Sequence, residues 1–397
     1  MDEQTKFRTD RARDDVVRPG RSPLTVLQVL PALEGGGVER GVLEIAKGLV
    51  EAGHRSLVAS SGGRMVRSLE ADGSRHFECA GGVKSPRCAF AIAQLRNLII
   101  RERVDVVDVH SRLPAWVTWM AVKTLPAHLR PRLISTFHGF YSVGRYSRIM
   151  GSGDVVISVS ESVQRYAQTS WPELDRSRMR VVPRGICMDE FPRGFTPTAD
   201  WVSQLYRDFP SAVGKILLLL PGRVTRLKGH LEFLNLVSEL RRVGLRVHGL
   251  IVGGIDPRKR SYADEVIARQ HALGLAKDIT WTGHRSDMRE FYAVSDLVLS
   301  LSQQPEAFGR TVAESLSLGT PVAGWDHGGA SEVLARQFPE GRVPPGDVSA
   351  LLKQVQWLLE NRSSIAIGEN PFSLADMINR TLEVYSEVVD GIGRRAA

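Results

Sequence analysis

Short apolar runs recur along this chain, and each is followed by a loop and then by a different pattern. The first run, "LTVLQVL" (24–30), precedes three glycines and the helical spacing of "VERGVLEIAKGLVEAG". Similar runs follow at residues 104–110, 132–138, 154–160, 179–185, 215–223, 246–254, 278–284, 296–302 and 321–326. Strands that are apolar on both faces and separated by helices belong in a parallel sheet covered on both sides.

The length of the chain and a break in this rhythm indicate two domains. At 397 residues the chain is too long for one ordinary core. The less periodic stretch 191–214 reads as a linker, so we expect two doubly wound α/β domains at 23–195 and 196–372. Residues 1–22 are charged and lack the apolar segment of a signal peptide, which predicts a disordered leader. The amphipathic stretch 373–390 could complete either domain, and we expect the segment 373–397 to form a helix that packs back on the N-terminal domain.

Charge and cysteine content indicate the cellular compartment and the kind of binding partner. Residues 1–200 contain 29 Lys and Arg against 22 Asp and Glu, a balance of +7, whereas the rest is balanced to +1. This asymmetry favours an anionic partner, although a dispersed solvated face explains it equally well. The sequence lacks the aromatic-basic pattern of single-strand nucleic-acid binders, which argues against nucleic acid. Three cysteines without metal-ligand spacing suit a reducing cytoplasm, and no apolar run is long enough to span a membrane.

Ligands of parallel sheets bind beyond the carboxyl ends of the strands, so the loops there are the candidate sites. The first is "EGGGVER" (34–40), where glycines allow close backbone approach and the following helix N-terminus favours an anion. The second is "PGRVTRLKGH" (221–230), where Arg223 and Lys228 could hold a diphosphate without a metal. A flexible turn and two solvated charges are the respective alternatives. Neither loop has the dinucleotide or P-loop spacing.

The third candidate loop is "QQPEAFGRTVAESLSLGTPV" (303–322). Gly309 permits a tight turn into a helix, which places Glu306 in the loop and Glu314 more than a turn inside the helix. The two carboxylates could then reach different parts of one extended ligand. A surface helix with two unrelated acids is the alternative.

The order of these pieces resembles the retaining glycosyltransferases of family 4, which have the GT-B fold of two Rossmann-like domains facing a cleft. The resemblance covers about residues 24 to 390, and a further piece is the "TFHG" segment with its histidine. The matching residues are Gly36, Gly37, His138, Arg223, Lys228, Glu306 and Glu314.

The resemblance implies a role for each residue of the C-terminal half. Arg223 and Lys228 hold the donor diphosphate and stabilise the leaving group. Glu306 accepts hydrogen bonds from hydroxyls of the transferred sugar, and Glu314 does so for the nucleotide ribose. Family members show no reliable carboxylate nucleophile, so departure and attack on the same face is the favoured mechanism.

The resemblance also implies roles for backbone groups and for the N-terminal half. Amides from Phe308 through Gly309 to Arg310 help with the sugar or phosphate. Gly36 and Gly37 let the first domain close on the diphosphate. His138 lies near the anomeric carbon and hydrogen-bonds the donor sugar; a purely structural histidine is the alternative.

The implied function is transfer of a hexose-type sugar from a nucleotide-diphosphate sugar to a saccharide or glycolipid, in lipopolysaccharide or surface polysaccharide synthesis. No metal or other cofactor is expected. Arg145 and Arg148 lie among tyrosines after His138, so the N-terminal domain could bind an anionic glycolipid and touch the inner face of the cytoplasmic membrane, or simply solvate a helix. A nucleotide-sugar epimerase and a non-catalytic sugar-nucleotide-binding protein are the alternatives.

Overall fold

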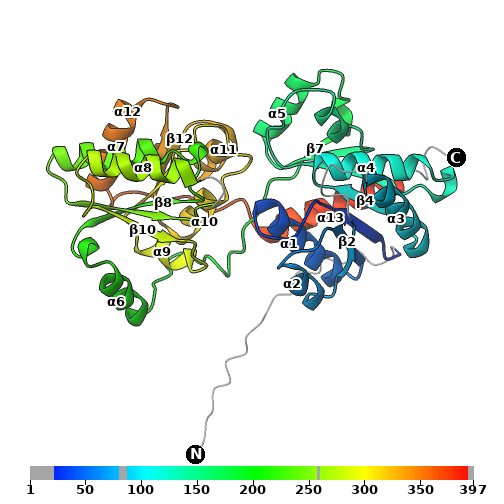
Figure 1. The fold of residues 1–397 in the computed structure, drawn as a ribbon, viewed down its shortest axis with the longest axis horizontal. Coiled ribbons are helices and arrows are strands. Elements are labelled where there is room, and N and C mark those ends of the chain that lie inside the picture. The colour runs from blue at the N-terminus through cyan, green and yellow to red at the C-terminus, as the bar shows by residue number, and fades with distance from the viewer. Residues whose placement is uncertain (1–21, 80–86, 257–259, 392–397) are drawn as a thin grey trace, which may run out of the picture.

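The chain forms two α/β domains joined by two crossing segments (Figure 1). The computed structural model describes residues 22–79, 87–256 and 260–391, so the predicted leader lies outside the described residues except for its last position. The N-terminal strands are β1 (Thr25–Val29), β2 (Arg55–Ser60), β3 (Arg75–Glu78), β4 (Val106–Val109), β5 (Arg132–Phe137), β6 (Val155–Ser158) and β7 (Met179–Val181). The C-terminal strands are β8 (Ile216–Pro221), β9 (Val247–Val252), β10 (Ile279–Gly283), β11 (Leu297–Ser300), β12 (Val322–Trp325) and β13 (Arg342–Val343).

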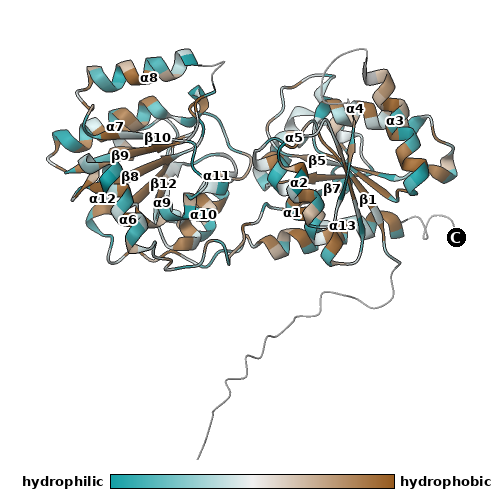
Figure 2. Cartoon of the chain, turned by 60° about the horizontal axis from the view of Figure 1, so that its bottom comes forward, coloured by the Kyte–Doolittle hydropathy of each residue, from teal (hydrophilic) through white to brown (hydrophobic). Residues whose placement is uncertain are grey.

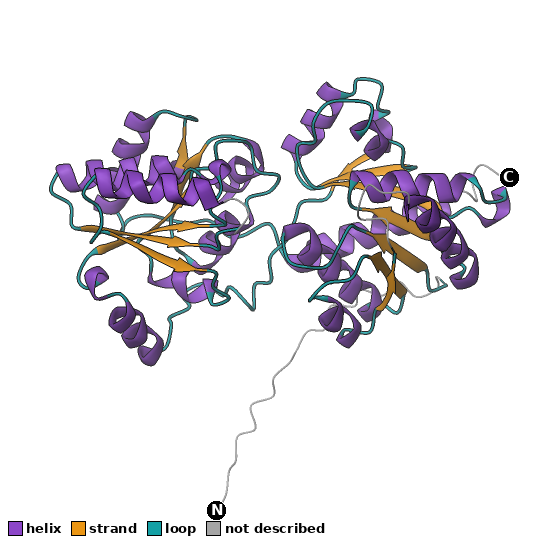
Figure 3. Ribbon diagram, in the orientation of Figure 1, coloured by secondary structure: helices purple, strands orange, loops and turns teal. Residues whose placement is uncertain are grey.

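Helices connect the strands and cover both faces of each sheet (Figure 3). The helices of the first half are α1 (Gly37–Glu51), α2 (Val66–Ala71), α3 (Arg87–Glu102), α4 (Arg112–Lys123), α5 (Glu161–Ser170) and α6 (Ala199–Asp208). Those of the second half are α7 (His230–Arg242), α8 (Arg260–Ala272), α9 (Met288–Val294), α10 (Arg310–Leu318), α11 (Gly328–Gln337), α12 (Val348–Glu360) and α13 (Leu374–Asp390).

Both sheets are parallel and doubly wound, which confirms the predicted fold class. The N-terminal order is β3-β2-β1-β4-β5-β6-β7 and the C-terminal order is β10-β9-β8-β11-β12-β13. Every residue of β1 is buried, including the polar Thr25 and Gln28, as expected for a central strand of a sheet covered on both faces. The strands are accordingly the most uniformly hydrophobic part of each domain (Figure 2). In each sheet the order reverses beside the first strand, where ligands of such folds bind.

The interpretation of residues 191–214 as a linker was wrong for its central part. This stretch contains α6, whose first turn is capped when the Thr198 side chain accepts a hydrogen bond from the Trp201 amide. The Trp201 indole packs edge-on against Phe291 of α9 and donates to Asp287 at 2.8 Å. Trp201, Leu205 and Tyr206 recur at helical spacing and pack against the core of the C-terminal domain. The repeat covers only this ten-residue helix, which is why the surrounding stretch reads as irregular.

Two segments cross between the domains side by side. Ile186 exchanges backbone hydrogen bonds with Phe372 and Leu374. A Cβ atom at Gly185 would lie 2.2 Å from the Ser373 carbonyl oxygen, so only glycine allows this approach. The chain then forms α13, which lies against α1 of the N-terminal domain (Figure 1).

Helix α13 belongs to the core of the N-terminal domain. Its buried residues are Met377, Thr381, Val384, Tyr385 and Val388. Their spacing of three to four residues places them on one face, which packs against residues of β1, β4 and β6. A buried polar contact adds to this packing, because the Tyr385 hydroxyl donates to Asp108 Oδ2 at 2.8 Å.

Candidate functional site

Lys228 and Glu306 meet at the carboxyl ends of β8 and β11. Lys228 Nζ lies 2.6 Å from Glu306 Oε1, and the Ser302 hydroxyl donates to the same oxygen. Lys228 ends a 3₁₀ turn, Arg226–Lys228, and the next residue has a left-handed backbone with φ of 73°. That residue is Gly229, where a Cβ would lie 2.1 Å from the Leu301 carbonyl oxygen. The glycine thus lets the lysine loop approach the loop that carries Glu306.

The electrostatics of this pair keep the carboxylate ionised. Burial acts to raise the pKa of Glu306, but the charge of Lys228 and the hydrogen bonds from Lys228 and Ser302 outweigh burial, so the pKa lies below its usual value. Glu306 is therefore an acceptor with one oxygen occupied. Its second oxygen has no protein donor among the described residues and is available to a hydroxyl group.

Glu314 occupies a different environment, on the inner face of α10. This helix starts after Gly309, whose φ is 86° and where a Cβ would lie 2.6 Å from Ala330 Cα. Glu314 is buried and accepts from the Tyr292 hydroxyl at 3.0 Å and from Arg310 Nε at 2.9 Å. Burial raises the pKa of Glu314, and Arg310 opposes this only in part. As predicted, Glu306 lies in the loop and Glu314 lies more than a turn inside the helix.

His138 lies at the carboxyl end of β5, between two other side chains. Arg184 Nη2 is 2.8 Å from its Nδ1, and His110 Nδ1 is 2.8 Å from its Nε2. A guanidinium can only donate, so Nδ1 of His138 is the acceptor and its proton sits on Nε2, directed at His110. Burial, with help from the charge of Arg184, holds the pKa of His138 well below its usual value.

A hydrogen bond from the His138 ring to a sugar therefore requires one of these two contacts to open. Behind it, His110 Nε2 faces Asp108 Oδ2 at 3.7 Å. That carboxylate also accepts from Thr136 at 2.8 Å and from the hydroxyl of Tyr385 on α13. The C-terminal helix thus supports the residues behind His138.

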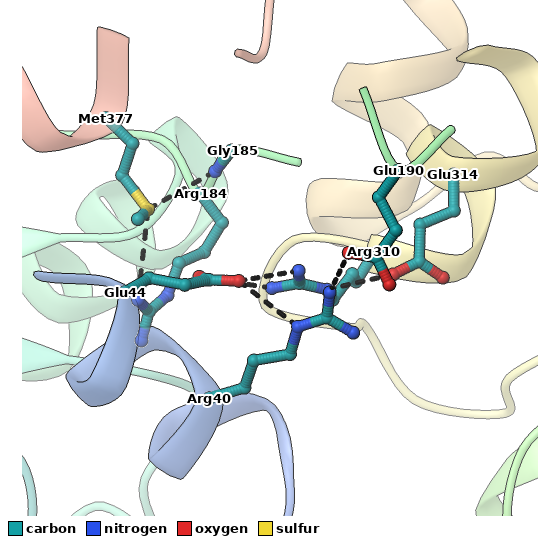
Figure 4. A network of polar contacts seen from close by, with 8 residues as sticks. All are labelled: Arg40, Glu44, Arg184, Gly185, Glu190, Arg310, Glu314 and Met377. Carbon is teal, nitrogen blue, oxygen red and sulfur yellow. Dashed lines mark hydrogen bonds and ion pairs between the residues drawn. The ribbon is translucent and has the colours of Figure 1, made fainter. Parts of the chain in front are cut away.

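A cluster of charged side chains joins the two domains (Figure 4). Arg310 of α10 pairs with Glu44 of α1, with Nη2 at 2.7 Å from Oε1 and Nη1 at 3.4 Å from Oε2. Arg40, one turn before Glu44, contacts the same carboxylate at 3.2 Å and also Glu190. Burial lowers the pKa of Arg184 to about 10, and the charge of Glu44 opposes this shift.

A second contact between the domains involves α5 and α11. The Glu332 carboxylate of α11 accepts from the backbone amides of Glu161 and Ser162, at the N-terminus of α5. Arg336, one turn further along α11, pairs with the Glu161 side chain at 2.8 Å. A carboxylate at a helix N-terminus is stabilised by the free amides and the helix dipole.

Not every residue predicted for the site joins these clusters. Arg223 is exposed and has no hydrogen-bond or ion-pair partner within the described residues. Gly36 and Gly37 begin α1, where a Cβ at Gly37 would meet open space. The Phe308 ring packs against Phe372 in the core, so only its backbone can face a ligand.

Sequence reasoning missed several residues of the site. His110 and Arg184 follow β4 and β7, so the rule that ligands bind beyond strand ends could have found them. Glu44 and Tyr292 lie inside helices, where no local pattern distinguishes them from other helical residues. Within the described ranges, no three His, Cys, Asp or Glu side chains lie close enough together to hold a metal ion.

Comparisons with known proteins agree with this architecture. The Glycosyltransferase Family 4 model matches residues 35–190, and the Glycosyl transferases group 1 model matches residues 204–370. A solved glycosyltransferase from Rickettsia africae ESF-5 is 29% identical with a TM-score of 0.81, over 93% of this chain and 99% of that one. Anabaena HepE, solved in complex with UDP-glucose, shares the fold at 18% identity and a TM-score of 0.72, over 94% of this chain and 100% of that one.

Two curated proteins are similar to long stretches of this chain. The D-inositol 3-phosphate glycosyltransferase of Rhodococcus erythropolis is 31% identical over 348 residues, which are 81% of this chain and 74% of the relative. The lipopolysaccharide 1,2-N-acetylglucosaminetransferase of Salmonella typhimurium is 29% identical over about half of each chain, 51% and 52%. Other matches cover as little as 36% of the relative's length.

Two parallel α/β domains with these relatives define a glycosyltransferase of the GT-B type. The chain belongs to glycosyltransferase family 4, of the group 1 glycosyl transferases.

Proposed function

We propose that the chain transfers a hexose-type sugar from a nucleotide-diphosphate sugar to a saccharide or glycolipid. The observation that carries this proposal is the pairing of Lys228 with Glu306 beside the start of α10. In the proposed complex, Lys228 and the unpaired Arg223 hold the diphosphate and offset charge on the leaving group. Glu306 accepts from sugar hydroxyls, and Glu314 accepts from the ribose.

We propose that no divalent metal is needed, because two cationic side chains take the electrostatic role at the diphosphate. The amides before the first turn of α10 and the loop at Gly36 and Gly37 add partial positive charge. His138 follows the carboxyl end of β5, and its pKa lies well below the usual value because it is buried, which favours the neutral ring. Its proposed contact is to the donor sugar, after release from His110.

Retention of the anomeric configuration is part of the proposal. Glu306 already accepts hydrogen bonds from Lys228 and Ser302, an arrangement suited to orienting a ligand more than to nucleophilic attack. Departure and attack then take place on the same face of the sugar, with the leaving phosphate helping to deprotonate the acceptor.

An α-linked donor should give an α-linked product if this mechanism holds. Proton NMR of the first product formed, read from the anomeric coupling constant, measures the configuration directly. A β-linked product would contradict retention. A C2-epimerised donor formed without any acceptor would favour the epimerase alternative instead.

The donor site is tested by nucleotide binding. We expect one family among UDP-, GDP-, ADP- and CMP-sugars to raise the melting midpoint of the wild-type protein, because a ligand that binds only the native state stabilises it. Lys228→Ala should weaken binding by about 1.5 to 3 kcal/mol, the cost of a lost charged hydrogen bond, or roughly 10- to 100-fold.

Each variant is compared with its own ligand-free midpoint, since Lys228→Ala also leaves Glu306 without its cation. Lys353→Ala, at an exposed position of α12, is the matched control and should bind like the wild type. Equal affinities of wild type and Lys228→Ala would remove Lys228 from the donor site.

For the acceptor, we propose a lipid-linked or phosphorylated saccharide and contact with an anionic lipid surface. A hollow of about 520 Å³ lies on the N-terminal domain beside α4. Its walls include the Trp116 and Trp119 rings, and Arg145, Arg148 and Arg178 surround it. Of these, Arg145 is exposed and without an ion-pair partner in the described part of the chain. Apolar rings and guanidinium groups that line one hollow suit a phosphate-bearing amphiphile. No helix in the described ranges has the length and apolar character to cross a bilayer.

Arg145→Ser should reduce sedimentation of the protein with vesicles containing phosphatidylglycerol, because each basic residue near an anionic surface adds about 1 kcal/mol. Arg67→Ser, at an exposed position of α2, is the control. Vesicles of phosphatidylcholine alone should bind neither variant nor the wild type. Unchanged sedimentation of Arg145→Ser would argue against this surface.

A further inference from the structure

Glu44 is a largely buried carboxylate that makes none of the proposed contacts to the donor. It lies on α1, two turns after the glycine loop, and its side chain is 11% exposed. Arg310, at 19% exposure, directs both terminal nitrogens at Glu44 and its Nε at Glu314. One guanidinium therefore connects a carboxylate of the N-terminal domain with the carboxylate proposed for the ribose (Figure 4).

This arrangement leaves hydrogen-bond acceptor positions of the buried Glu314 carboxylate unfilled. Arg310 Nε takes one position on Oε1 and the Tyr292 hydroxyl takes one on Oε2. A carboxylate has about four acceptor positions, so a ribose diol can still be bound. Without Glu44, the terminal nitrogens of Arg310 would lose their acceptor, and the arginine could form a two-pronged pair with Glu314. Such a pair would cover the positions that the ribose needs.

We propose that Glu44 is a positioning residue for the donor: it holds Arg310 so that Glu314 stays available to the ribose. Because α1 starts at the glycine loop, the same ion pair also fixes that loop relative to α10. The inference rests on the proposed function, in which Glu314 binds the nucleotide.

The neighbours of Glu44 strengthen this role. Arg40 contacts its Oε1 from the preceding turn, and the charge of Arg184 lies close enough to interact with it. Arg184 fits there because position 41 is glycine: a Cβ on Gly41 would lie 1.8 Å from the guanidinium. Burial acts to lower the pKa of Arg310, but Glu44 and then Glu314 raise it above its usual value. Three arginines, Arg40, Arg184 and Arg310, therefore interact with the Glu44 carboxylate.

The test uses Glu44→Gln, which keeps the shape of the side chain and removes its charge. The probes are the nucleoside diphosphate that the wild type binds and its 2′,3′-dideoxy analogue, both titrated by calorimetry. We expect Glu44→Gln to bind the nucleoside diphosphate about tenfold more weakly, the lower end of the cost of a charged hydrogen bond. The dideoxy analogue should bind wild type and variant with the same affinity, because it lacks the two ribose hydroxyls that would donate to Glu314.

Two further variants separate positioning from a general structural effect. Glu51→Gln on the same helix removes an exposed carboxylate that pairs with Lys47 at 3.9 Å, and it should bind like the wild type. In an Arg310→Gln background, Glu44→Gln should cause no additional loss, since Glu44 acts through Arg310.

Equal affinity of Glu44→Gln and wild type would overturn the inference. So would an equal loss for both probes, which would mark a merely structural role. If the wild type itself binds no nucleoside diphosphate, the proposed function fails first and this inference fails with it.

Discussion

Parallel strands determine where the functional side chains of this chain can lie. In each domain all strands run in one direction, so every loop after a strand emerges at the same edge of the sheet. Lys228 follows β8, Glu306 follows β11 and His138 follows β5. Residues far apart in sequence are therefore assembled without any local signal that they belong together. Glu44 does not follow a strand: it lies inside α1 and reaches the other domain through its ion pair with Arg310.

The neighbouring charges and the degree of burial give Glu306 and Glu314 different pKa values. The cation beside Glu306 keeps its pKa below the usual value, whereas burial raises that of Glu314 even though Arg310 donates to it. Two acids of the same motif thus differ because one is paired with a lysine and a hydroxyl, and the other with an arginine shared with Glu44. A buried pair of this kind adds little net stability, because the cost of removing both charges from water offsets much of their attraction.

Much of the fold could be predicted from sequence, because strands apolar on both faces and glycines at strand ends are local signals. The positions of Glu306 and Glu314 relative to the helix start also followed from Gly309. Helix α6 was missed because its apolar repeat is only ten residues long and lies within an otherwise irregular stretch. The pairing of Arg310 with Glu44 was missed because it joins residues 266 positions apart. No pattern within one element records a contact between two domains.

The contacts of His138 likewise could not be predicted from the sequence. Its place at the end of β5 could be predicted, but its two ring nitrogens are both engaged, by Arg184 and His110. Sequence patterns place a side chain at an edge, and the hydrogen bonds it makes depend on which side chains reach it from other strands.

The most direct test is a crystal structure with a bound, non-hydrolysable nucleotide-diphosphate sugar. The ribose hydroxyls should lie within hydrogen-bond distance of Glu314, the sugar hydroxyls within that distance of Glu306, and the diphosphate beside Lys228. A nucleotide bound elsewhere, or one whose ribose and sugar avoid both carboxylates, would contradict the assignment of this site.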